Sequence, residues 1–163
     1  LFVPGDGAAA AVLTTAKGSD HTIVGTGVQH TWPSTLEIMG WEVSNNGLEV
    51  IFDRDIPPFI RRQIAPVVNN FLKELNLTRD AVVRFGFHPG GTKVLEALES
   101  ALTLKPGALD IERSILKDHG NMSAPTVFFV LKRLLEKALP GTYLMSALGP
   151  GFTAAAISVT VQN

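Results

Sequence analysis

The alternation of amphipathic helical segments with short β-rich segments is the feature that most constrains the fold of this chain. The longest helical segment runs from residue 57 to about residue 75 and starts with a Pro-Pro pair, which a first helical turn accepts. Its apolar residues recur at helical spacing and form one face, made of Ile60, Ile64, Val67, Val68, Phe71, Leu72 and Leu75. Further helices are predicted over residues 92–102, 109–117 and about 124–138.

The segments between these helices favour strands. Runs rich in β-forming residues cover residues 8–15, 21–30, 36–43, 48–52, 81–87, 142–148 and 152–161. The Asn-Gly pair at residues 46–47 predicts an antiparallel hairpin between 36–43 and 48–52. Strands that alternate with helices in this way predict one α/β domain over residues 1–163, with a layered mixed β-sheet and packed helices.

The composition excludes several classes of site and partner. The chain has no cysteine, so it holds no disulfide, no thiolate zinc site and no cysteine nucleophile. Its net charge of −1 argues against a nucleic-acid-binding domain. No apolar run approaches the ~18 residues of a membrane-spanning helix. The first residues carry neither an initiator Met nor a basic segment, and we expect the chain to be part of a longer protein.

Familiar ligand-binding patterns are incomplete in this sequence. Residues 86–93 look like a phosphate-binding loop, but Thr92 precedes Lys93 where the pattern needs the reverse order. Two runs with dinucleotide-type glycine spacing, at residues 5–10 and 149–154, lack the required strand–turn–helix context. The four histidines show no paired spacing typical of metal ligands, so we predict no metal site.

His88 lies where a predicted strand ends and is followed by Pro89-Gly90-Gly91 before a helix begins. Groups at the carboxyl ends of strands in α/β proteins face ligand crevices, and a helix start offers free N–H groups to an anion. Two glycines allow the backbone to approach a ligand closely. The alternative interpretation is a histidine in an ordinary glycine-rich turn.

The run Gly120-Asn121-Met122-Ser123 is the second candidate. Asn and Ser are both good helix N-caps, so a structural role for this run is a strong alternative. An Asn amide is also a neutral, fixed donor suited to polarising a carbonyl or stabilising an enolate.

Together these segments resemble the type III polyketide synthases, the chalcone and stilbene synthase family. The resembling segments occur in the family's order and at about its spacing, and they are Phe2…Gly5-Asp6-Gly7, His88-Pro89-Gly90-Gly91, Leu104-Lys105-Pro106, Gly120-Asn121-Met122-Ser123 and Gly149-Pro150-Gly151-Phe152-Thr153. They span essentially the whole chain, which corresponds to the C-terminal half of a family member. The stretch at residues 39–43 is more similar to bacterial members than to plant ones.

The resemblance implies a thiolase-like fold of two similar halves, with this chain as the second. It implies a Cys–His–Asn catalytic triad in which His88 and Asn121 are the last two members. The cysteine then belongs to the N-terminal half, which this chain lacks, so the chain alone is expected to be inactive. The implied reaction is a decarboxylative condensation of malonyl-CoA onto an acyl-CoA starter, giving a pyrone, resorcinol or related polyketide, with CoA thioesters as substrates and no cofactor.

The resemblance also implies binding roles for other residues. The substrate and CoA positions that it implies are Phe2 as a gatekeeper, Gly90 and Gly91, Lys93 near the CoA phosphates, and Ser123, Gly149, Pro150 and Gly151 as cavity lining. We expect a cytoplasmic homodimer with no nucleic-acid or membrane partner. Two alternatives stay open, namely a ketoacyl-ACP synthase III-like initiator of fatty-acid synthesis and a noncatalytic thiolase half that serves as a binding or partner subunit.

Overall fold

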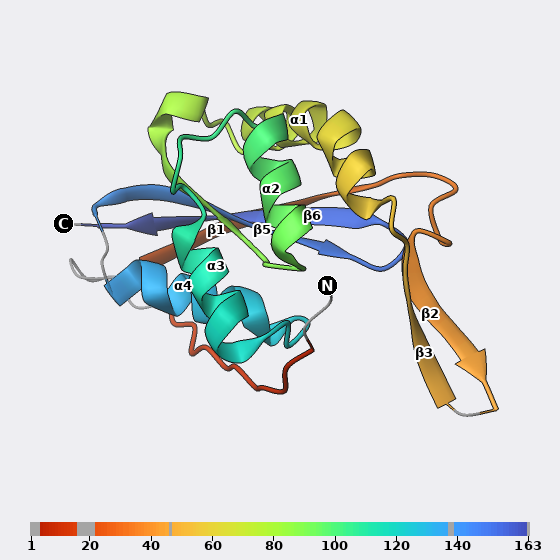
Figure 1. Ribbon diagram of the computed structural model, residues 1–163. Helices are drawn as coiled ribbons and strands as arrows, with labels where there is room; N and C mark the ends of the chain where they lie inside the picture. Colours follow the sequence, from red (N-terminus) through yellow and green to blue (C-terminus); the bar gives the residue numbers. More distant parts are fainter. Residues whose placement is uncertain (1–3, 16–21, 46, 137–138, 163) are drawn as a thin grey trace.

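The computed structural model describes residues 4–15, 22–45, 47–136 and 139–162, and Figure 1 shows their arrangement. In chain order the elements are β1 (Thr22–Thr31), β2 (Met39–Ser44), β3 (Gly47–Phe52), α1 (Ile56–Glu74), a short 3₁₀ turn η1 (Arg79–Ala81), β4 (Val82–Phe87), α2 (Thr92–Ala101), α3 (Asp110–His119), α4 (Pro125–Glu136), β5 (Gly141–Gly149) and β6 (Thr153–Val161). The four predicted helices and the predicted strand order are therefore confirmed, with one exception described below.

Four strands form a mixed sheet in the order β1-β6-β5-β4. β6 pairs antiparallel with both β1 and β5, whereas β4 pairs parallel with β5. Phe87 near the end of β4 is in register with Ser146 of β5. Because β4 and β5 run in the same direction, the residues that follow them emerge at the same edge of the sheet.

Helices cover both faces of this sheet, with α1 and α2 on one side and α3 and α4 on the other (Figure 1). Successive side chains of a strand point to opposite faces, and β5 follows this rule. Leu144 joins the apolar core beneath α1 and α2. Tyr143 and Met145 join a second cluster with Val130 and Leu134 of α4. The layered mixed α/β fold predicted from the sequence is confirmed.

The hairpin β2–β3 projects away from the sheet (Figure 1). Its register pairs Trp41 with Val50 and Glu42 with Glu49, so one face of the ribbon is apolar and the other acidic. Trp41 and Val50 are both exposed. The predicted hairpin is confirmed, although its first strand begins at Met39 instead of residue 36.

The predicted strand over residues 8–15 is wrong, because these residues have no regular structure. Among the described residues no strand pairs with them, and a strand without a partner leaves its backbone N–H and C=O groups unpaired. Ala8 to Ala11 instead pass along α3 and α4, where they line a cleft with Ile115 and Phe128. The side chain of Val12 is 96% exposed.

None of the helices in the described part of the chain is both long and apolar enough to cross a membrane. α4 extends to Glu136 in the structure, and the last two residues of the predicted helix, 137 and 138, lie outside the described residues.

Candidate functional site

His88 directly follows the last residue of β4. Its backbone N–H donates to the Ser146 carbonyl oxygen at 2.8 Å, which extends the parallel pairing with β5 by one residue. The side chain is largely buried, and this burial lowers the pKa of His88 from its ordinary value of 6.5 to about 4. At neutral pH the imidazole in this chain is therefore uncharged, with one ring nitrogen that donates and one that accepts.

Two hydrogen bonds fix the side-chain amide of Asn121. Its Oδ1 accepts the Ser123 backbone N–H at 2.8 Å, and its Nδ2 donates to the Gly90 carbonyl oxygen at 3.3 Å. An amide nitrogen carries two hydrogens. Within the described part of the chain, the second hydrogen of Nδ2 has no acceptor. Asn121 thus presents a fixed N–H donor beside Gly90.

The turn that carries Asn121 is held by Thr126 from the first turn of α4. The Thr126 hydroxyl accepts the Met122 N–H at 2.9 Å and donates to the Ser123 carbonyl oxygen at 2.8 Å. Ser123 has a φ of +63°, a conformation that L-residues adopt at a cost of about 1–2 kcal/mol. The helix begins at Pro125, so the Asn121 side chain closes a turn before the helix and does not cap it. The N-cap interpretation of Asn121 is therefore wrong.

Gly90 lies next to both candidate residues. A Cβ atom added at Gly90 would lie 4.0 Å from Cδ2 of His88, while the Gly90 carbonyl accepts the Asn121 amide. A Cβ atom added at Gly91 would have no neighbour within 4 Å. Gly90 therefore lies next to both candidate side chains, and Gly91 beside it borders space that the described side chains leave open.

A third segment, residues 5–7, packs against the Asn121 turn. The Gly5 N–H donates to the Asn121 carbonyl oxygen at 2.9 Å. A Cβ atom at Gly5 would lie 2.0 Å from the His119 carbonyl oxygen, and one at Gly7 would lie 2.3 Å from the Met122 sulfur. The backbone contact makes Gly5 necessary for this close approach, whereas the flexible Met122 side chain could shift to admit a Cβ at residue 7. Phe2, the predicted gatekeeper, lies outside the described residues.

The remaining predicted site residues lie at the margin of this arrangement. Lys93 is exposed in the first turn of α2, and Ser123 is exposed beside Asn121. The Gly149-Pro150-Gly151 turn leaves the sheet at the same edge as His88. The Gly151 N–H of this turn donates to the Met39 carbonyl oxygen at 2.8 Å, so the turn contacts another segment of the chain.

An apolar cleft of about 400 Å³ lies on the sheet next to these elements. Its lining comes from β1, β5, β6 and the first turn of α4, and consists of Gly27, Val28, Gln29, Val127, Met145, Ser146, Ala147, Ala155, Ala156 and Ile157. Ser146 also accepts the His88 N–H, so the cleft adjoins the strand position that holds the histidine.

The sequence-based search missed two residues that shape the site. Thr126 closes the Asn121 turn, and a Thr in the first turn of a predicted helix was the only sign of it. Glu112 accepts the backbone N–H of Phe87, the residue before His88. The sign of burial in the sequence is that Glu112, an acidic residue, shares a helical face with Leu109 and Leu116. Across the described ranges, no group of three or more His, Asp or Glu side chains gathers as a metal site would require.

The comparisons with known proteins agree with one another. A model of the C-terminal domain of chalcone and stilbene synthases matches residues 24–160. The chain is 37% identical over 160 residues to 1,3,6,8-tetrahydroxynaphthalene synthase of Streptomyces peucetius subsp. caesius. This alignment covers 92% of the chain and 42% of that protein. The chain is 38% identical over 120 residues to a putative chalcone synthase of Bacillus subtilis. This second alignment covers 72% of the chain and 33% of that protein.

Solved structures show the same fold. The crystal structure of PKS-I from the brown alga Ectocarpus siliculosus matches with a TM-score of 0.81 at 24% identity, over 90% of this chain and 41% of that one. The C-terminal type III polyketide synthase domain of Steely1 from Dictyostelium matches with a TM-score of 0.79 at 23% identity, over 87% of this chain and 41% of that one. The expected thiolase-like fold is thereby confirmed. The chain spans about two fifths of the length of most of these relatives, and it belongs to the chalcone and stilbene synthases, whose C-terminal domain it carries.

Proposed function

We propose that the protein containing this chain is a type III polyketide synthase that condenses malonyl-CoA with an acyl-CoA starter. The observation that carries this proposal is the position of Gly90, which lies next to His88 and accepts the fixed Asn121 amide through its carbonyl oxygen. A neutral imidazole and an amide each supply one N–H donor there. Two preorganised neutral donors next to open space suit an oxygen that gains negative charge during a reaction.

The proposed step places the thioester carbonyl of malonyl-CoA between His88 and Asn121. Cleavage of the bond to the malonyl carboxylate releases CO₂ and leaves the electron pair as an enolate on the thioester oxygen. Each N–H donor to such an oxygen contributes about 3–4 kcal/mol to lowering the barrier. The enolate carbon then attacks the acyl group on the nucleophile, a new C–C bond forms, and the nucleophile leaves as the free anion.

The proposed nucleophile is a cysteine in a part of the protein outside this chain, since the chain itself has none. A thiolate is the reactive form of cysteine, and an adjacent imidazolium favours it. Burial alone keeps His88 neutral. The proposal therefore requires the cysteine thiol to give its proton to His88, so that a thiolate–imidazolium pair is present before acyl transfer.

The substrate positions follow from the surroundings of this pair. Open space at Gly91 suits the close approach of a CoA thioester, and exposed Lys93 in the first turn of α2 suits the CoA phosphates. Ser123 and the turn at residues 149–151 are proposed as cavity lining. The product class, a pyrone, resorcinol or related polyketide, and the cytoplasmic homodimer stay predictions.

The test uses the full-length protein supplied with malonyl-CoA and a set of acyl-CoA starters. His88→Ala is expected to lower the rate of CO₂ release by about 10²–10³-fold because one donor is lost. His30→Ala on β1 is the matched control and should keep the wild-type rate. Unchanged CO₂ release in His88→Ala would refute the assignment. A strong preference for malonyl carried on acyl carrier protein over malonyl-CoA would support the ketoacyl-ACP synthase alternative instead.

A further inference from the structure

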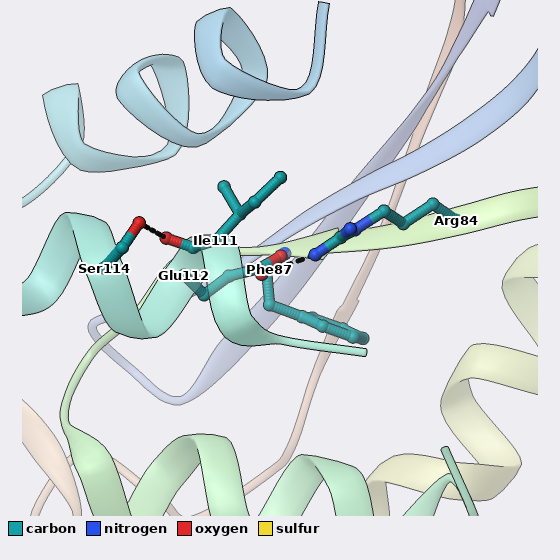
Figure 2. Close-up of polar contacts among 5 residues, drawn as sticks. All are labelled: Arg84, Phe87, Ile111, Glu112 and Ser114. Atoms are coloured by element: carbon teal, nitrogen blue, oxygen red, sulfur yellow. Dashed lines mark hydrogen bonds and ion pairs between the residues drawn. The ribbon is translucent and has the colours of Figure 1, made fainter. Parts of the chain in front are cut away.

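Glu112 of α3 is a carboxylate with no exposed surface, next to the strand that carries His88. Figure 2 shows its side chain between Arg84 and Phe87 of β4. Its Oε1 accepts the Phe87 backbone N–H at 3.2 Å, and its Oε2 lies 3.4 Å from a guanidinium nitrogen of Arg84. Burying a carboxylate costs several kcal/mol unless such partners compensate it. Its position therefore needs an explanation.

The contact with Phe87 follows from the geometry of the sheet. β4 is an edge strand, and successive backbone N–H groups of a strand point to opposite sides. The His88 N–H points inward to Ser146 of β5, so the Phe87 N–H points outward, away from the sheet. A buried N–H needs an acceptor. Glu112 is that acceptor, and the end of β4 is consequently held from both sides.

The ion pair with Arg84 explains the placement of Glu112 less well. Its 3.4 Å separation is long for a charge-assisted hydrogen bond. The Nε atom of Arg84 is buried without a hydrogen-bond partner among the described residues, and the Arg84 side chain is 27% exposed. A buried ion pair with incomplete hydrogen bonding is seldom net stabilising. The shorter contact is the one with the Phe87 N–H.

Glu112 also connects the two candidate catalytic residues through the chain. It projects from α3, which ends at His119 and leads through Gly120 directly to Asn121. Its bond to Phe87 reaches the residue before His88. One carboxylate thus ties the helix that delivers Asn121 to the strand that delivers His88.

We propose that Glu112 is a positioning residue that fixes His88 relative to Asn121 by holding the outward N–H of Phe87. This inference rests on the proposed function, because it assigns a catalytic consequence to that placement. Misplacing a catalytic group by about 1 Å can cost about 10²-fold in rate. The effect is expected in kcat for malonyl-CoA decarboxylation, since Glu112 contacts the residue before His88 and is fully buried.

The test compares two double variants of the full-length protein that differ only in the acceptor. Arg84→Met/Glu112→Gln removes both charges but keeps an oxygen for the Phe87 N–H, and its kcat should stay within about threefold of wild type. Arg84→Met/Glu112→Leu removes the oxygen as well, and its kcat should fall by about 10- to 100-fold with little change in KM. Equal kcat values in the two double variants would overturn the proposal.

Two further variants distinguish a positioning role from a loss of folding. Glu112→Asp keeps the charge near Arg84 but is one methylene shorter, so it should lower kcat while the protein remains folded; a wild-type kcat would contradict the proposal. Glu99→Gln is the matched control, because Glu99 of α2 pairs with Arg113 of α3, the helix that carries Glu112, without contacting Phe87. This variant should keep the wild-type kcat.

The two proposals fail in distinguishable ways. If His88→Ala abolishes decarboxylation while the acceptor-free variant keeps full kcat, the function stands and the positioning role of Glu112 is refuted. If His88→Ala has no effect, the proposed function fails, and the positioning role that rests on it fails too.

Discussion

In the proposed full-length enzyme, the charge on His88 is set by two effects of similar size and opposite sign. Burial lowers the pKa of His88 from 6.5 to about 4, which disfavours the imidazolium by about 3 kcal/mol. A thiolate about 4 Å away favours the imidazolium by about 4 kcal/mol at an effective dielectric constant of 20. The attraction is therefore large enough to offset the burial cost, and a thiolate at that separation is expected to return the pKa of His88 toward its ordinary range.

The perturbation that tests this balance is the replacement of the proposed nucleophilic cysteine of the full-length protein by alanine. NMR titration of histidine-labelled protein reports the His88 pKa directly, and His88→Gln identifies its signal. Without the thiol, His88 should titrate near pH 4; with it, above about pH 6. Titration at the same pH in both proteins would refute the coupling between the two groups.

Four substitutions test other parts of the structure. Gly5→Ala should lower Tm by several degrees and Gly7→Ala by less, because the new Cβ at residue 5 meets a backbone oxygen whereas that at residue 7 meets the flexible end of Met122; equal losses would contradict this packing. Lys93→Glu should raise the KM for malonyl-CoA about tenfold without changing kcat, as expected for loss of a phosphate contact, and an unchanged KM would remove Lys93 from the CoA site. Phe152→Ala should destabilise the fold by about 3–5 kcal/mol in urea unfolding, because Phe152 is fully buried against Trp32; a loss below about 1 kcal/mol would contradict that role.

Local patterns in the sequence sufficed for the elements whose structure is decided locally. The apolar stripe from Ile60 to Leu72 lies on the buried face of α1, and the Asn-Gly pair marks the turn region between β2 and β3. Residues 8–15 have the same local signal as a strand, yet in the described part of the chain no strand pairs with them. Propensity alone therefore predicted this segment wrongly.

The arrangement of the candidate site depends on contacts across long sequence distances. His88 and Asn121 could be selected from their motifs, and Asn121 could be assigned an amide donor role. The orientation of that amide is set by Gly90, 31 residues away in sequence, and its turn is packed against Gly5. The helical spacing of Glu112 with Leu109 and Leu116 is the one sign in the sequence that it is buried, and no residue pattern reveals its partner, because that partner is a backbone N–H.

The central claim is that Asn121 and His88 act together on the thioester oxygen of malonyl-CoA. Asn121→Asp in the full-length protein tests it most directly, because the aspartate keeps an oxygen for the Ser123 N–H but loses the N–H donor. Stopped-flow measurement should show malonyl-CoA decarboxylation slowed by about 10²–10³-fold, with acyl transfer from the starter onto the enzyme within a few-fold of wild type. Decarboxylation at the wild-type rate, or an equal loss in both steps, would contradict the account.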